Sequence, residues 1–151
     1  MRFGPIFSLT DPRDLLKKAE HDLGRLRTNP LSAYAAFDFF VTVRHLPDWL
    51  HPGDKASQSA LFSKHVELRI ARHLADGAKH VVLHNTNLKQ VSGTVGTQPA
   101  FQRGAFSDAF QTGRLVVQLD PRDPDTLSLG AEIEALELAE RTFAVARGVV
   151  V

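Results

Sequence analysis

Apolar residues recur at helical spacing in four stretches of the chain. In the first stretch, Asp11 and Pro12 supply a carboxylate cap followed by a proline suited to the first helical position. The apolar positions that follow are Leu15, Ala19, Leu23 and Leu26. This spacing predicts an amphipathic helix over about residues 11–27.

Asn29 and Pro30 repeat that start signal ahead of a long apolar run, LSAYAAFDFFVTVRHLPDWL. Its aromatic content predicts a second helix at the centre of the core. Pro47 is expected to end or kink this helix near residues 44–46, with a loop at 51–54. A third helix is predicted over about residues 57–76, with Gly77 as its C-cap.

The apolar period changes from residue 80 onward. The runs HVVLH, QVSGTVGT and RLVVQL are rich in β-branched residues and predict two or three antiparallel strands. An irregular loop is expected at 99–113, a turn at 120–125 and a final helix at about 128–147. The predicted fold class is therefore mainly α (α+β), with four helices and a small antiparallel β element between the third and the fourth.

The composition limits the classes of protein to which this chain can belong. A chain of 151 residues, 43% hydrophobic and 23% charged, suits a single domain spanning 1–151. The absence of cysteine excludes disulfides, Cys-ligated metals and a thiol nucleophile. A net charge of +1 requires any nucleic-acid binding to come from a local patch. The N-terminal segment has no signal or spanning pattern, so a cytoplasmic protein with no membrane partner is expected.

A polar stripe runs along the predicted third helix. His65, Arg69, Arg72 and Asp76 fall within an arc of roughly 60°. Apolar residues flank the stripe on both sides, so it should be partly buried or should line a cleft. One interpretation is an ion-pair network in which Asp76 neutralises the arginines. The other is an anion site, because two arginines can hold a phosphate and a histidine can transfer protons near neutral pH.

Lys79 and His80 follow the stripe directly and add a cation and an imidazole. Phosphodiester cleavage without a metal needs a base, an acid and cations near the phosphate, and these residue types are present. The candidate catalytic residues are His80 and Arg72, and the candidate phosphate-binding residues are Arg69 and Lys79. The secondary candidates are His65, His73, Asp76, Arg44 and His51.

The sequence gives less support to metal binding, nucleotide binding or a serine nucleophile. A metal site at His45, Asp48 and His51 is weakly indicated because Pro47 interrupts their spacing, so no metal and no cofactor are predicted. The chain has neither a nucleotide-binding glycine fingerprint nor a nucleophile elbow. The C-terminal valines, 149–151, could form an apolar contact in a homodimer.

Two segments carry a resemblance to known proteins. FFVTVRHLPDWL (39–50) and RHLADGAKH (72–80) resemble motifs of a widespread family of small bacterial and phage-borne proteins with no established activity. The resemblance covers roughly residues 30–84. At the positions of His73 and Asp76, the motif of this family resembles Asp and Asn instead.

The helical pattern also resembles the HEPN superfamily, whose helical bundles include metal-independent RNases of toxin–antitoxin and phage-defence systems and also non-catalytic members. Those RNases share an Arg followed by a polar residue, and a His separated from that Arg by four to six residues. Arg44, His45 and His51 match with six residues between Arg44 and His51, whereas Arg72, His73 and His80 exceed the range by one. The resemblance implies a four-helix HEPN-like bundle that binds or cleaves RNA, with an antitoxin or another protein as partner. The alternative is a non-catalytic interaction or structural protein, and the residues leave open whether the chain is an enzyme.

Overall fold

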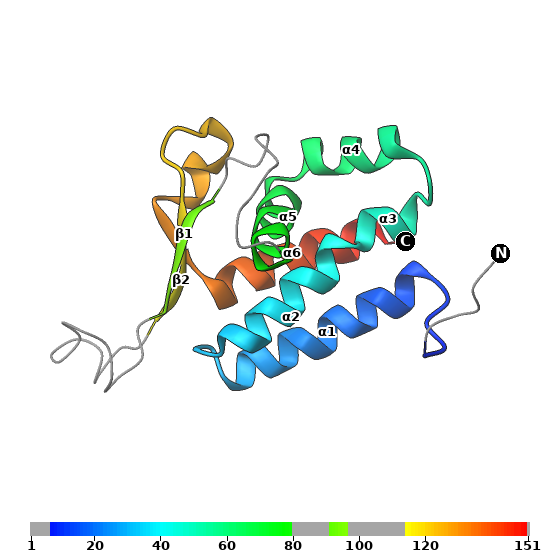
Figure 1. Ribbon diagram of the computed structural model, residues 1–151, viewed down its shortest axis with the longest axis horizontal. Coiled ribbons are helices and arrows are strands. Elements are labelled where there is room, and N and C mark those ends of the chain that lie inside the picture. Colours follow the sequence, from blue (N-terminus) through cyan, green and yellow to red (C-terminus); the bar gives the residue numbers. More distant parts are fainter. Residues whose placement is uncertain (1–6, 80–90, 97–113, 151) are drawn as a thin grey trace, which may run out of the picture.

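The computed structural model describes residues 7–79, 91–96 and 114–150, and within them all side chains except those of 78, 79 and 92–96. The described chain is mainly helical with a small antiparallel sheet, as predicted (Figure 1). The helices are α1 (Pro12–Thr28), α2 (Ala33–Arg44), α3 (Leu46–Leu50), α4 (Lys55–Lys64), α5 (Val66–Lys79) and α6 (Ala135–Val149). The strands are β1 (Val91–Gly96), β2 (Leu115–Leu119) and β3 (Glu132–Glu134).

Helix α1 follows its predicted start signal, whereas the start of the second helix predicted at Asn29 and Pro30 is wrong. The Asp11 carboxylate accepts a hydrogen bond from the backbone N–H of Arg13 at 2.7 Å and caps α1. Helix α2 begins after Ser32, whose hydroxyl oxygen accepts from the N–H of Ala35. It ends at Arg44, and Pro47 lies in the first turn of the short helix α3. The predicted break near Pro47 is confirmed, although the residues after it form a further helix.

The single helix predicted over 57–76 is wrong, because the chain breaks into α4 and α5 at His65. That residue has extended backbone angles, φ −122° and ψ 109°. In a continuous helix, the carbonyl groups of Phe62 and Ser63 would accept from backbone N–H groups four residues later. Here the Arg69 guanidinium donates to both, at 3.0 Å and 2.8 Å. Gly77 lies within α5 and is not its C-cap.

The predicted start of the last helix at 128 is also wrong. Residues Pro124–Leu129 form a 3-10 helix, and Gly130 follows with a φ of 89°, a left-handed conformation that favours glycine. Residues 132–134 then pair with β2 as strand β3, and α6 begins only at Ala135.

The sheet is antiparallel with the order β1-β2-β3. Val95 lies opposite Val116 in the first pair of strands, and Val117 lies opposite Ile133 in the second. Since the predicted third helix is two helices and α3 is additional, the strands lie after the fifth helix and before the sixth. The loop predicted at 99–113 and the strand predicted at HVVLH lie outside the described residues.

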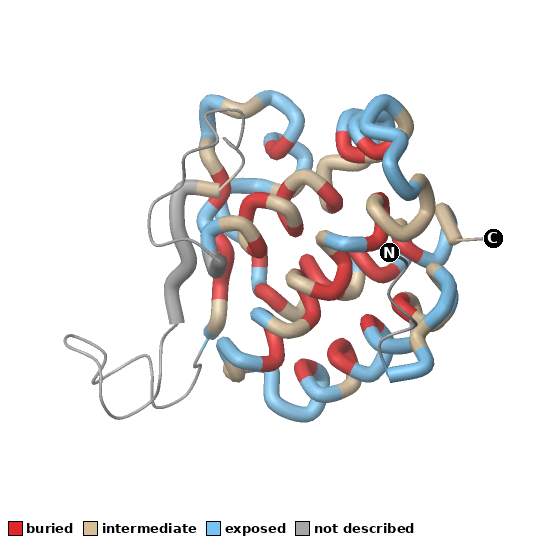
Figure 2. Tube along the Cα trace, turned by 45° about the vertical axis from the view of Figure 1, so that its right-hand side comes forward, coloured by how far each residue is buried: buried red, intermediate tan, exposed pale blue. Residues whose placement is uncertain are grey.

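One buried core joins α1, α2, α5 and α6 to the sheet. Figure 2 shows the buried positions concentrated on the inward sides of these helices. Phe39 of α2 is fully buried and packs edge-on against Phe40, with ring centroids 5.2 Å apart. Val149 and Val150 pack beside a smaller cluster formed by Leu15, Leu46 and Ala146. These two terminal valines are therefore only partly exposed.

Candidate functional site

Charged residues from three helices meet where α2 ends. The Nε of Arg44 lies 3.3 Å from Oδ1 of Asp76 on α5, and its Nη1 lies 3.3 Å from Oδ2 of Asp48 on α3. The Nε of Arg72 lies 3.9 Å from the other oxygen of Asp76. Together with Phe62 of α4, these four residues form what we call the arginine cluster.

Phe62 supplies an aromatic surface for both arginines of the cluster. The guanidinium carbon of Arg72 lies 5.0 Å from the centroid of the Phe62 ring, and that of Arg44 lies 5.8 Å from it. Both distances permit cation–π attraction. The Phe62 side chain is itself only 7% exposed and belongs to the core. The ring therefore couples the position of the two cations to the packing of α4 on the rest of the protein.

Arg72 differs from Arg44 in how its hydrogen-bond donors are used. The Arg72 Nε is buried and has no hydrogen-bond partner among the residues that the structure describes, although the side chain as a whole is 33% exposed. Its nearest carboxylate oxygen, at 3.9 Å, is beyond hydrogen-bond range. A buried donor without an acceptor is unfavourable. The exposed third of the side chain is the part that an anionic acceptor can reach.

Arg69 contacts groups outside the arginine cluster. Besides the two carbonyl groups at the end of α4, its guanidinium contacts the Asp125 carboxylate at 2.6 Å. The side chain is 19% exposed. The structure thus assigns Arg69 a role in closing the end of α4 and joining α5 to the 3-10 helix, away from the carboxylates of the arginine cluster.

His65 lies at the break between α4 and α5 and is partly buried. Its Nε2 is buried and finds no hydrogen-bond partner within the described part of the chain. Because the helix is interrupted at this residue, the stripe predicted from one continuous helical phase does not extend to His65. Only Arg72 and Asp76 of that stripe enter the arginine cluster.

His73 faces the sheet instead of the arginine cluster. Its side chain is 7% exposed, and its Nδ1 accepts a hydrogen bond from the backbone N–H of Val91 at 3.1 Å. Burial lowers the pKa of His73 below its ordinary value of 6.5, partly opposed by the charge of Asp76. The accepted hydrogen bond also requires a neutral Nδ1.

The position of His73 predicts a dependence of stability on pH. Because its pKa is lowered in the folded state, the neutral ring contributes stability above pH 6.5 that is lost as the pH falls through the folded-state pKa. We expect the free energy of unfolding, measured by urea titration, to decrease below pH 6.5. The variant His73→Gln should reduce that decrease, and an unchanged pH profile in this variant would contradict the assignment.

The remaining candidates lie apart or outside the described residues. His80 has no described position, and the Lys79 side chain is not described. The His51 carbonyl oxygen accepts from Nε2 of Gln58 at 2.7 Å, and no contact in the described chain joins the His51 ring to Arg44. His45 Nδ1 lies 3.6 Å from Asp48. Within the described ranges, no three His, Asp or Glu side chains are grouped as metal ligands.

Two members of the arginine cluster have roles that the sequence pattern did not indicate. Phe62 is part of an apolar shoulder of the stripe, and nothing in its spacing identifies a platform for two cations. Asp48 pairs with Arg44 four residues earlier, whereas the sequence pattern indicated it only weakly, as a metal ligand. Arg44 contacts Asp76 across 32 positions of sequence, so no local pattern could reveal that pair.

Comparisons of the chain with protein-family models, with curated proteins and with solved structures found no match. Among the helices that the structure describes, none combines the length and apolar character needed to cross a membrane.

Proposed function

We propose that this protein is an RNA-binding, HEPN-like helical protein that holds a phosphate at Arg72 and cleaves RNA without a metal. The observation that supports the proposal is the state of Arg72. Its side chain is partly exposed, its guanidinium carbon lies 5.0 Å from the centroid of the Phe62 ring, and its Nε has no hydrogen-bond acceptor among the described residues. The shared core of α1, α2, α5 and α6 is compatible with the bundle that the resemblance implies.

The stacking suits Arg72 to phosphate recognition. A guanidinium is planar, and an aromatic ring against one face leaves N–H groups at its edges. Since Nε is buried here, the N–H groups of Nη1 and Nη2 are the ones proposed for an anion. A phosphate oxygen can then accept two of them in a fork. Asp48 and Asp76 balance the charges of Arg44 and Arg72, so the attraction is local and involves few phosphates. We therefore expect a shallow dependence of affinity on salt.

In the proposed reaction, the 2′-oxygen bonds to phosphorus while the bond from phosphorus to the 5′-oxygen breaks. His80 is either the base that takes the 2′-hydroxyl proton or the acid that protonates the leaving 5′-oxygen, and water makes the other proton transfer. Arg72 stabilises the negative charge that develops on the phosphate, and Lys79 adds a second cation. His80 and Lys79 enter from the sequence, because they immediately follow the stretch of α5 that carries Arg72 and Asp76.

A second candidate function is a non-catalytic interaction protein in which the charged stripe only orders the fold. The observation that favours it is the pairing of the other arginines. Arg44 contacts both Asp48 and Asp76, and Arg69 contacts Asp125. In this reading, the partner is another protein, such as an antitoxin or a second copy of the chain.

Binding of labelled single-stranded RNA to the variant Arg72→Gln tests the proposal. We expect this variant to bind about 10- to 100-fold more weakly, the range for loss of a hydrogen bond to a charged group. The control is Arg141→Gln, which removes an exposed arginine of α6 that pairs with Glu137. Equal affinities of wild type and Arg72→Gln would favour the second candidate.

A further inference from the structure

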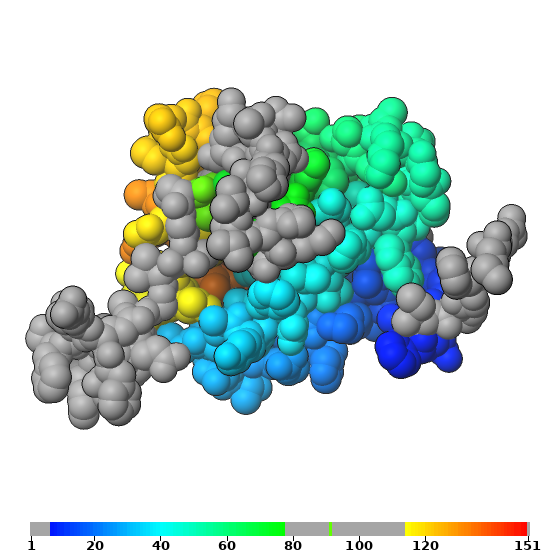
Figure 3. Space-filling model, in the orientation of Figure 1, coloured from blue at the N-terminus to red at the C-terminus, as the bar shows by residue number. Residues whose placement is uncertain are grey.

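The outer face of α2 carries two exposed aromatic rings. Tyr34 is 83% exposed and Phe37 is 48% exposed, and they lie one helical turn apart. The other large apolar side chains that the described chain exposes, Phe7 and Leu127, lie outside the six helices. Figure 3 shows α2 beside α1 on one face of the molecule.

This aromatic pair lies in line with the arginine cluster. Phe37, Val41 and Arg44 are separated by four and then three residues, so they share one side of α2. At 1.5 Å per residue, Phe37 and Arg44 are about 10 Å apart along the helix axis. Stacked nucleotides rise about 3.4 Å each, so about three of them would cover this length.

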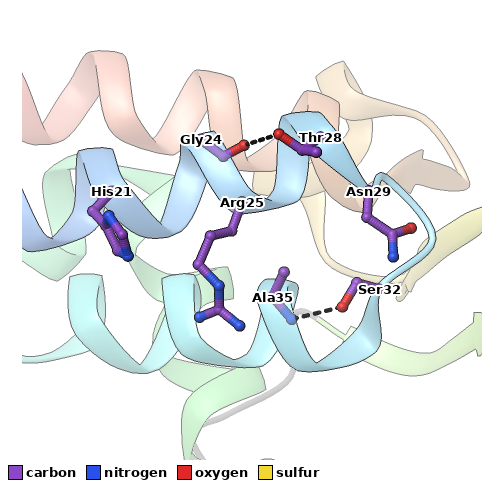
Figure 4. A pocket seen from close by; sticks show the side chains of 7 residues that line it. All are labelled: His21, Gly24, Arg25, Thr28, Asn29, Ser32 and Ala35. Carbon is purple, nitrogen blue, oxygen red and sulfur yellow. Dashed lines mark hydrogen bonds between the residues drawn. The ribbon is translucent and has the colours of Figure 1, made fainter.

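A hollow of about 550 Å³ lies between α1 and α2 (Figure 4). His21 and Arg25 extend from α1 towards α2, and Asn29 and Ser32 lie where the two helices are joined. Arg25 contacts Asp38 at 2.6 Å, so its charge is already balanced. The hollow therefore offers mainly neutral hydrogen-bonding groups, which suit base edges and ribose hydroxyls better than phosphate.

We infer that the outer face of α2 binds the bases of single-stranded RNA, which stack on Tyr34 and Phe37 while a neighbouring phosphate lies at Arg72. This inference rests on the proposed RNA-binding function and adds the recognition of unpaired bases to it. Aromatic rings accept any base because every base has a π-face. Binding at this face is therefore tolerant of sequence and selective for single strands.

RNA fits this face better than a protein partner does. The exposed apolar area of α2 consists of two rings, and Asp38, the residue after Phe37, forms an ion pair with Arg25 of the hollow. A protein interface needs a larger dry centre with a buried apolar anchor. A row of stacked bases needs only separate rings next to cationic and polar groups.

The test compares two ligands of equal length, a labelled oligouridine and an abasic ribose-phosphate oligomer. Fluorescence anisotropy gives the dissociation constant of each ligand for the full-length chain and its variants. The double variant Tyr34→Ala/Phe37→Ala is expected to bind oligouridine about 10- to 100-fold more weakly and the abasic oligomer equally well. The variant Tyr34→Phe/Phe37→Tyr should keep wild-type affinity, because both of its rings still stack.

Leu127→Ala is the matched control, since it removes an exposed apolar side chain outside α2. Unchanged oligouridine affinity in the double alanine variant would overturn the inference while leaving RNA binding at Arg72 intact. Failure of the wild type to bind either ligand would overturn both proposals. Self-association of the wild type that the double alanine variant abolishes, without RNA binding, would assign the face to protein contact instead.

Discussion

His80→Ala is expected to lower the rate of RNA cleavage by about 10²- to 10⁴-fold, the usual contribution of a general acid or base. The wild type should cleave end-labelled single-stranded RNA in excess EDTA, because the proposed reaction uses only side-chain proton transfer and cations. The measurement is the single-turnover rate with protein in excess over RNA. Binding of the same RNA should be nearly unchanged in His80→Ala, since the phosphate is held by Arg72.

Two further histidine variants make this result specific. His84→Ala is the matched control, because it removes the same residue type four positions later in the sequence. His51→Ala tests a different Arg–His pair. Arg44 and His51 fit the spacing of the RNase pattern, which Arg72 and His80 exceed by one residue. Full loss of cleavage in His51→Ala with none in His80→Ala would move the proton-transfer role to His51. Cleavage by none of the proteins, across several RNAs, would favour the non-catalytic function.

Phe62→Ala is expected to destabilise the protein by about 3–5 kcal/mol, the range for removing a buried phenylalanine. Two effects act together at this residue. The core loses a side chain that is 7% exposed, and Arg44 and Arg72 lose the ring against which both guanidinium groups lie. The free energy of unfolding from urea titration measures the sum. Phe62→Leu should recover much of the packing and none of the cation–π attraction.

Phe143→Ala provides the comparison for Phe62→Ala. Phe143 is 6% exposed in the same core, and one arginine, Arg147, lies 5.9 Å from its ring centroid. A larger loss at Phe62 than at Phe143 is expected because two cations depend on Phe62. A double-mutant cycle with Arg72→Met and Phe62→Leu should give a coupling of about 0.5–1 kcal/mol. A coupling of zero would mean that the ring only fills space.

The arginine cluster links the two predictions. If RNA binds as proposed, phosphate at Arg72 stabilises the folded state in proportion to its occupancy. We expect the unfolding midpoint of the wild type to rise with added oligouridine. The same addition should leave the midpoint of Arg72→Gln nearly unchanged.

Local chemistry was sufficient for much of the secondary structure. Asp11 and Pro12 define the start of α1 through groups that lie within one turn of each other. The runs of β-branched residues predicted the positions of β1 and β2, and Pro47 predicted the end of α2. Strand preference and helix breaking by proline both depend on near neighbours in the chain, so the sequence shows them directly. The sequence pattern offered pairing of Asp76 with Arg72 as one interpretation, but it gave no indication of the contact between Arg44 and Asp76.

Long-range packing decided the rest. The break at His65 is stabilised by an arginine whose carboxylate partner, Asp125, lies 56 residues away, so helical periodicity alone predicted a continuous helix. The arginine cluster exists because α2 and α5 pack against each other and bring Arg44 to Asp76. Periodicity reports which side of a helix is apolar, but only the arrangement of the helices determines which charged side chains meet.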